Sequence, residues 1–201
     1  MGKGVSGRGG RGSGFKKEIG SGVGVSTGGA DKDRSKSLLN AKANTQIDFK
    51  SYKSALRNFA EQHANANREF AYVMSDRGYV YQYRKGMAHS VTHYVPDTKK
   101  LGIKGGYTIV HNHPSGSHFS TTDLKSWKDV PSQKRVVAVA RGSKTAYTVT
   151  KTPKFNAKGF GKALGKIKLN TKSMTEYNKS MESFLKSNAK KYGYTYSAKK
   201  V

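Results

Sequence analysis

Two histidines separated by one residue, His111 and His113, end a short β-rich run at 107–110. In an extended segment alternate side chains point to the same face, so both imidazoles are expected on one side of the strand end. Two neutral imidazole nitrogens on one face suit Zn²⁺, which takes four ligands in a tetrahedron and keeps one position for water in a catalytic site. A third protein ligand is then needed, and Asp123 is the best candidate because a Pro-Ser-Gly turn at 114–116 brings the chain back toward the histidines.

The position of Asp123 depends on the start of a predicted helix. Ser120 is expected at the N-cap, so Asp123 lies one turn into the helix and faces the preceding loop. The same Ser-x-x-Asp spacing is also typical of an ordinary helix capping box without a metal. A single His-x-His is likewise common on plain strands. The two patterns together, joined by a tight turn, favour a metal site.

The stretch from His111 to Asp123 resembles the JAMM motif of the JAB/MPN metallopeptidases, in which His-x-His-Pro is followed by a loop and then Ser-x-x-Asp. Residues 111–116 are similar to the bacterial RadC branch, whereas residues 119–124 look more like JAB domains of phage proteins and bacterial toxins. The resemblance covers residues 45–152 and is strongest at 107–124. It implies a mixed β-sheet flanked by helices, similar to the cytidine deaminases, and a zinc-dependent peptidase or isopeptidase.

The resemblance also implies roles for two further residues. The family carries a catalytic Glu on an earlier strand, and Glu69 opens a strand ahead of the motif. Glu69 would take a proton from the attacking water and pass it to the leaving amine, and Ser120 would help to hold the oxyanion of the tetrahedral intermediate. The chain departs from the family in having one residue fewer than usual, nine, between His113 and Asp123. The missing residue falls in the loop, which bears on substrate contacts more than on the ligands themselves.

The elements that must position these residues follow from periodicity. Apolar residues at helical spacing predict helices at about 47–67 and 173–190, and the capped segment 121–128 predicts another. Strands are predicted at 70–74, 79–83, 91–94, 107–110, 136–140 and 146–150. The order indicates an α/β or α+β domain over 45–152, followed at 153–201 by a basic Gly/Lys-rich linker and a C-terminal amphipathic helix. The closing residues 190–200 suit either a final edge strand or stacking on single-stranded nucleic acid.

Charge points to an anionic partner. The 201 residues include 38 Lys+Arg and 12 Asp+Glu, a formal net charge of +26, which attracts polyanions. Residues 1–37 are rich in Gly, Lys and Arg and are expected to be a disordered arm. Candidate nucleic-acid contacts in this arm are Arg8, Arg11, Lys16 and Lys17, although a flexible leader without that role fits equally well.

The absence of cysteine excludes disulfides and Cys-ligated zinc, and no apolar run is long enough to span a bilayer.

Three functions follow from these patterns. The leading one is a zinc-dependent hydrolase that acts on a peptide or isopeptide. The alternative is a nucleic-acid-associated protein in which the same fold is a scaffold or a nuclease, and a third is a structural protein of a phage or mobile element that packs into an assembly such as a virion. The location is left open between cytoplasm, virion and delivered effector, as are the substrate and the oligomeric state.

Overall fold

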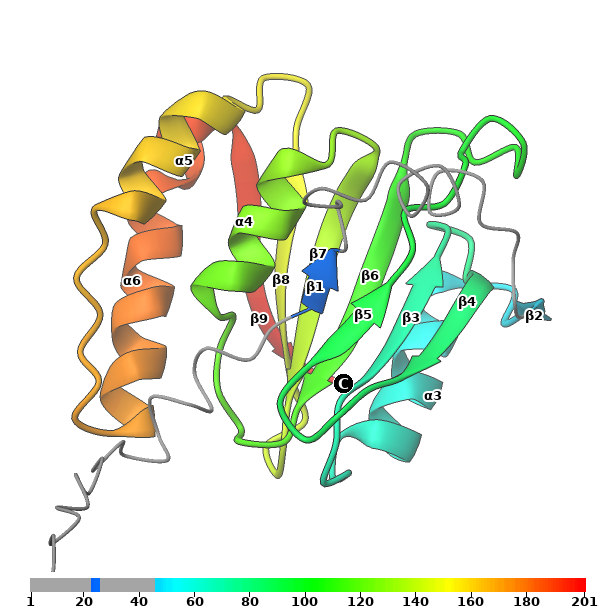
Figure 1. The fold of residues 1–201 in the computed structure, drawn as a ribbon, viewed down its shortest axis with the longest axis horizontal. Coiled ribbons are helices and arrows are strands. Elements are labelled where there is room, and N and C mark those ends of the chain that lie inside the picture. Colours follow the sequence, from blue (N-terminus) through cyan, green and yellow to red (C-terminus); the bar gives the residue numbers. More distant parts are fainter. Residues whose placement is uncertain (1–22, 26–45) are drawn as a thin grey trace, which may run out of the picture.

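The computed structural model describes residues 23–25 and 46–201 and is built on a mixed seven-stranded sheet (Figure 1). The strand order is β2-β4-β3-β6-β7-β8-β9. The strands are β2 (Ile47–Asp48), β3 (Phe70–Met74), β4 (Tyr79–Lys85), β6 (Tyr107–His113), β7 (Gln133–Ala140), β8 (Thr145–Lys151) and β9 (Tyr194–Lys200). Only β6 and β7 are parallel among these neighbours, and the other pairs are antiparallel. The predicted mixed sheet flanked by helices is confirmed.

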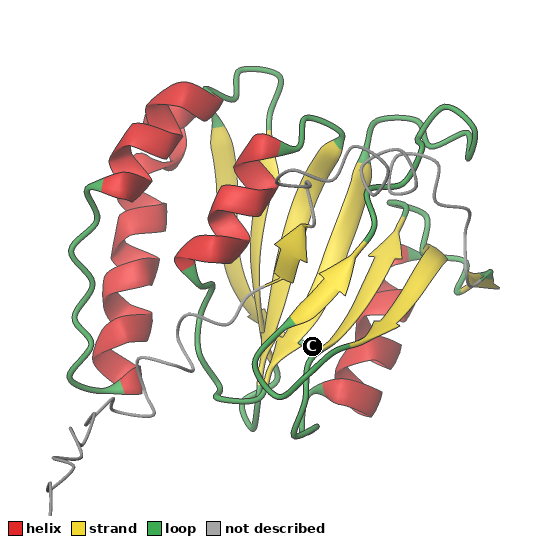
Figure 2. Ribbon diagram, in the orientation of Figure 1, coloured by secondary structure: helices red, strands yellow, loops and turns green. Residues whose placement is uncertain are grey.

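Helices cover both faces of this sheet (Figure 2). Helix α3 (Tyr52–His63) packs on one face, whereas α4 (Thr121–Asp129), α5 (Ala157–Gly165) and α6 (Met174–Tyr192) pack on the other. Successive side chains of β7 alternate between the two hydrophobic cores, one on each face of the sheet. Val136 and Ala138 belong to the hydrophobic core beneath α4–α6, and Val137 and Val139 belong to the core beneath α3. The central strands are therefore buried on both faces.

The chain passes from β6 to its parallel neighbour β7 through α4, because parallel strands require a crossover connection. All seven residues of β6 are buried. Tyr107 and Ile109 face the same side of the sheet as α4, in a cluster with Val91 and Val130. The two-residue period of a strand places His111 and His113 on that same face, next to the start of α4.

Two local differences separate the structure from the sequence-based expectation. The first helix begins at Tyr52 rather than near residue 47, because Ile47 and Asp48 pair with β4 and Lys50 has a positive φ of 62°. The stretch 153–169, predicted to be a linker, contains helix α5. Its Phe160 and Leu164 lie four residues apart and are buried in the same core as α4 and α6. Their burial stabilises a helix that the Gly/Lys-rich composition obscures.

Two further predictions, for the closing residues 190–200 and for the arm at 1–37, can be compared with the structure. The final segment is an edge strand, β9, paired antiparallel with β8, and Tyr194 and Tyr196 pack into the core beneath α6 rather than offering free faces for stacking. Val23–Val25 falls in the segment expected to be disordered, yet it forms strand β1, which pairs in parallel with β5 (Val91–His93) in a separate two-stranded sheet. Valine favours this extended conformation.

The four basic residues proposed as nucleic-acid contacts, Arg8, Arg11, Lys16 and Lys17, lie outside the described residues. None of the helices in the described part of the chain combines the length and apolar character needed to cross a membrane.

Candidate metal centre

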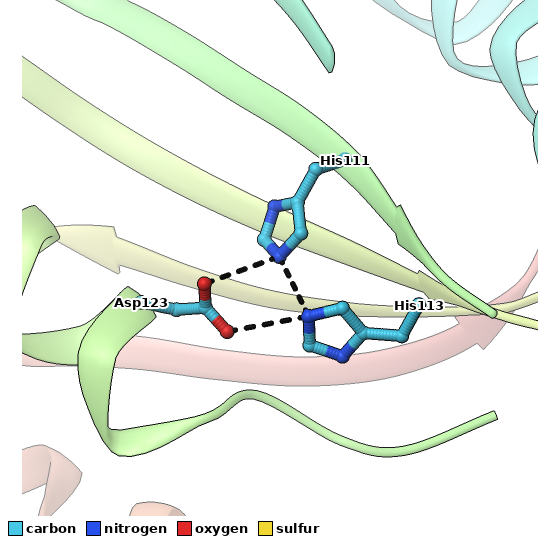
Figure 3. Close-up of side chains that lie close together, drawn as sticks. All are labelled: His111, His113 and Asp123. Carbon is cyan, nitrogen blue, oxygen red and sulfur yellow. Dashed lines mark hydrogen bonds and ion pairs between the residues drawn. The ribbon is translucent and has the colours of Figure 1, made fainter. Parts of the chain in front are cut away.

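His111, His113 and Asp123 converge in the interior of the protein (Figure 3). The Nε2 atoms of the two histidines are 3.0 Å apart. The Nε2 atom of His111 is 3.4 Å from Asp123 Oδ1, and that of His113 is 3.4 Å from Asp123 Oδ2. All three residues are at most 1% exposed. The structure thus brings together the three residues predicted from the sequence as metal ligands.

These distances fit a small divalent ion. Zn²⁺ bonds of about 2.0–2.1 Å in a tetrahedron separate neighbouring ligand atoms by about 3.3–3.4 Å. The three measured separations of 3.0, 3.4 and 3.4 Å lie close to that value. Two imidazoles and one carboxylate leave one tetrahedral position for water, which is the ligand count of catalytic sites. The group can therefore hold a metal ion.

The loop after β6 fixes the orientation of His113. Its Nδ1–H donates to the carbonyl oxygen of His118 at 2.9 Å and, more weakly, to that of Ser117 at 3.2 Å. A proton on Nδ1 leaves the lone pair of the neutral ring on Nε2, the atom that faces Asp123 and His111. Carbonyl groups behind ligand histidines perform this function in metal sites.

The start of α4 fixes Asp123. Ser120 is the N-cap of this helix, and its hydroxyl accepts the N–H of Asp123 at 3.1 Å. In return Asp123 Oδ2 accepts the Ser120 N–H at 2.7 Å and the Ser120 hydroxyl at 2.9 Å. The helix capping box that the Ser-x-x-Asp spacing predicts is therefore present. The same Asp123 carboxylate also faces the two histidines. In this geometry Ser120 orients a ligand, and its oxyanion role stays a prediction.

The cluster is strongly coupled electrostatically. Burial lowers the pKa of His111 more than Asp123 raises it. Burial also lowers the pKa of His113, but hydrogen bonding and charge interaction with Asp123 outweigh it and raise that pKa to about 9. Burial raises the pKa of Asp123, yet the two histidines hold it well below its usual value. Without a metal, the carboxylate is thus ionised, and His113 is the histidine that holds an additional proton.

Glu69 lies immediately before β3 and is completely buried. Ala71 pairs with His111 in the antiparallel ladder, so the same register continued by two residues brings Glu69 opposite His113 on the same face. The charge of Glu69 contributes to the raised pKa of His113. The predicted general base therefore lies within electrostatic range of the candidate ligands.

Asn112, the residue between the two histidines, was not singled out from the sequence. Its Oδ1 accepts the N–H of Phe70 at 2.7 Å, and its Nδ2 donates to the carbonyl oxygen of Arg68 at 3.0 Å. These two bonds hold the backbone on either side of Glu69. Because successive side chains of a strand alternate, Asn112 points away from the histidines while it fixes the strand that carries the acid.

The C-terminal helix and strand hold the loop of the motif. Asn178 on α6 accepts the N–H of His118 at 2.7 Å and donates to the carbonyl oxygen of Gly116 at 3.3 Å. The His118 ring stacks on Tyr147, with centroids 3.9 Å apart, and its Nε2 lies 2.9 Å from the hydroxyl of Tyr196 on β9. Burial lowers the pKa of His118 to about 3, so the ring is neutral. His118 was not assigned a role from its sequence, and in the structure its contacts hold the loop in place.

A second buried histidine adjoins the cluster. His93 ends β5 and is 1% exposed, and neither of its ring nitrogens has a hydrogen-bond partner among the described residues. Burial, followed by the charge of His111, lowers the pKa of His93 to about 3. The Nδ1 of His111 also has no hydrogen-bond partner within the described part of the chain. His93 is therefore a neutral neighbour of the candidate centre.

Comparisons of the chain with protein-family models, with curated proteins and with solved structures gave no match. The resemblance to the JAB/MPN family accordingly rests on the motif at 111–123.

Proposed function

We propose that this chain is a zinc-dependent hydrolase of the JAB/MPN type that cleaves a peptide or isopeptide bond. The observation that supports it most is the convergence of three ligand atoms from His111, His113 and Asp123 at separations of 3.0–3.4 Å. The buried Glu69 on the neighbouring strand adds the acid–base group that such chemistry requires.

A hydrogen-bonded polar cluster without metal is the competing explanation. Two imidazoles and an ionised carboxylate are removed from water, which costs several kcal/mol for an ion unless partners compensate. The two Nε2 atoms face each other at 3.0 Å, so the cluster without metal requires an additional proton on the histidines to avoid repulsion between their lone pairs. A divalent cation would satisfy both nitrogens and the carboxylate together.

Bound zinc would polarise a scissile carbonyl and lower the pKa of water to about 7. Glu69 would accept the proton released by the attacking water and then donate it to the leaving amine. Ser120 would keep Asp123 in place, and the carbonyl groups of Ser117 and His118 would keep the His113 ring turned toward the centre. Since these site residues are at most 2% exposed, a substrate reaches them only when neighbouring segments move.

The first test is the metal content of protein purified without chelator. We expect about one zinc per chain in the wild type and none in the His111→Ala/His113→Ala double variant. His89→Ala is the matched control, because His89 is exposed and is expected to leave zinc bound. A wild-type chain that contains no zinc and takes up none on titration would refute the proposal.

The second test separates catalysis from metal binding. Glu69→Gln retains the shape of the side chain but cannot accept a proton at neutral pH, so turnover should fall by about 10²–10⁴-fold while zinc stays bound. Substrates are screened with a mixed peptide library and with peptides joined through a lysine side chain, read by mass spectrometry. Full activity of the zinc-loaded variant would remove Glu69 from the mechanism.

A further inference from the structure

A groove of about 730 Å³ lies on the α3 face of the sheet. The first two turns of α3 form one wall, and β8 and the end of β9 form the floor and the opposite wall. The metal centre lies on the other face, since His111 and His113 share the side of Ile109 whereas Val110 packs beneath α3. The groove is thus separated from the candidate centre by the thickness of the sheet.

Small hydroxyl residues make the floor of the groove polar. Thr148 on β8 is the direct neighbour of Ser197 on β9, and both line the groove. On the opposite face the same two strands present Tyr147, Val149 and Tyr196 to the core beneath α4–α6. Strands that carry small hydroxyl residues on one face and large apolar residues on the other are built to leave the polar face open.

The walls of the groove are basic. Lys53 and Arg57, one turn apart on α3, are exposed on one side, and Lys199, which pairs with Ala146 on the α3 face of the sheet, is exposed on the other. No carboxylate side chain lines the groove. Within the described part of the chain none of these three cations forms an ion pair. Three exposed cations therefore line the walls of the groove, with no Asp or Glu side chain among them.

Arg135 differs from these three cations. Its guanidinium pairs with Asp76 at 3.0 Å and donates to Thr150 at 3.1 Å. It also lies over the Tyr52 ring, 4.5 Å from the centroid. The charge of Arg135 is thus neutralised by Asp76. Its guanidinium covers the face of the Tyr52 ring that could otherwise stack on a base.

We propose that this groove binds the phosphodiester backbone of a nucleic acid. Lysine, arginine and hydroxyl groups are the usual partners of phosphate oxygens, and the covered Tyr52 ring favours backbone contacts over base stacking. Binding should therefore depend strongly on salt and little on sequence. Because the groove and the metal centre occupy opposite faces, the nucleic acid is a tether for the protein and not the substrate of the centre.

The test is fluorescence anisotropy of the full chain with a short labelled DNA duplex, titrated over a range of salt concentrations. Lys53→Gln/Arg57→Gln removes two of the three cations. If both contact phosphates, the slope of log K against log salt becomes shallower by about 1.8, which extrapolates to about a thirtyfold loss of affinity at about 0.15 M salt. Lys199→Gln, on the opposite wall, removes one cation and should make the slope shallower by about 0.9.

Lys158→Gln/Lys162→Gln is the matched control, since these exposed lysines have the same four-residue spacing on α5, on the other face of the sheet. An equal loss in this control would show that binding follows the total charge and would overturn the assignment to the groove. Displacement of the DNA by polyglutamate at equal charge concentration would assign the groove to acidic proteins and overturn it as well. Glu69→Gln should bind DNA like the wild type, so the result is independent of the proposed hydrolase.

Discussion

Replacing Asn178 by alanine tests whether α6 positions the metal ligands. Asn178 holds the loop between β6 and α4 through the N–H of His118 and the carbonyl oxygen of Gly116. The carbonyl oxygen of His118 in turn accepts the Nδ1–H of His113. The substitution therefore acts on a ligand through one intervening residue, without contact to the ligand atoms.

The magnitude follows from the two bonds that are lost. The N–H of His118 loses its acceptor at 2.7 Å in a residue that is 0% exposed, which costs about 1–3 kcal/mol. The contact with Gly116, at 3.3 Å, contributes less than about 1 kcal/mol. Together they predict a loss of about 2 kcal/mol, or a fall in Tm of about 4–8 °C for a chain of this size. Weaker support of His113 should reduce zinc affinity by about 10–100-fold.

Zinc affinity is measured by competition with a chromogenic chelator, and stability is measured by thermal unfolding of the metal-free protein. Asn188→Ala is the matched control, because Asn188 is a half-buried asparagine of the same helix that bonds to the carbonyl oxygen of Phe184, within α6. Asn178→Ala with reduced stability but unchanged zinc affinity would show that the loop holds His113 without help from α6, and the reasoning would be refuted.

Four further outcomes are expected. Zinc at a thousandfold excess over its Kd should stabilise the fold by about 4 kcal/mol and raise Tm by about 8–16 °C; chelator should reverse the shift, and the double-histidine variant should show none. Asn112→Ala should keep zinc bound but lower turnover by about 10–100-fold, measured as kcat, because the backbone around Glu69 loses both of its side-chain bonds. Burial lowers the pKa of Lys151 from 10.5 to about 8, so the unfolded chain binds this proton more tightly and stability rises between these two pH values. Lys151→Met should flatten that rise in denaturant titrations compared with the wild type. Gly193→Ala should destabilise the fold by about 2 kcal/mol or more in urea unfolding, because φ is +69° and a Cβ atom would come within 2.3 Å of the carbonyl oxygen of Lys154.

Much of the candidate site could be predicted from short stretches of the sequence. The three candidate ligands could be predicted because His-x-His, the turn and the Ser-x-x-Asp cap lie within 13 consecutive residues, 111–123. Alternation and helical spacing indicated most strands and the first and last helices for the same reason. The shorter loop did not prevent Asp123 from approaching both histidines, and Gly116, with φ of +75°, makes the turn.

Contacts between distant segments could not be predicted in this way. Asn178 and Tyr196 are ordinary polar residues in sequence, and only the packing of α6 and the pairing of β9 bring them to His118. Helix α5 escaped prediction because its stability depends on burying Phe160 and Leu164 against elements on either side of it in the chain. Asn112 was overlooked because its partners belong to a strand about 40 residues earlier.

The anchoring of the motif loop by the last helix and strand also bears on when, during synthesis, the loop is held in place. The hydrogen bonds from the loop to Tyr177, Asn178 and Tyr196 span 58 to 78 residues along the chain. A ribosome delivers the ligands of the centre well before it delivers these partners, since synthesis proceeds from the N-terminus. A nascent or prematurely terminated chain therefore carries the complete motif in an unsupported loop.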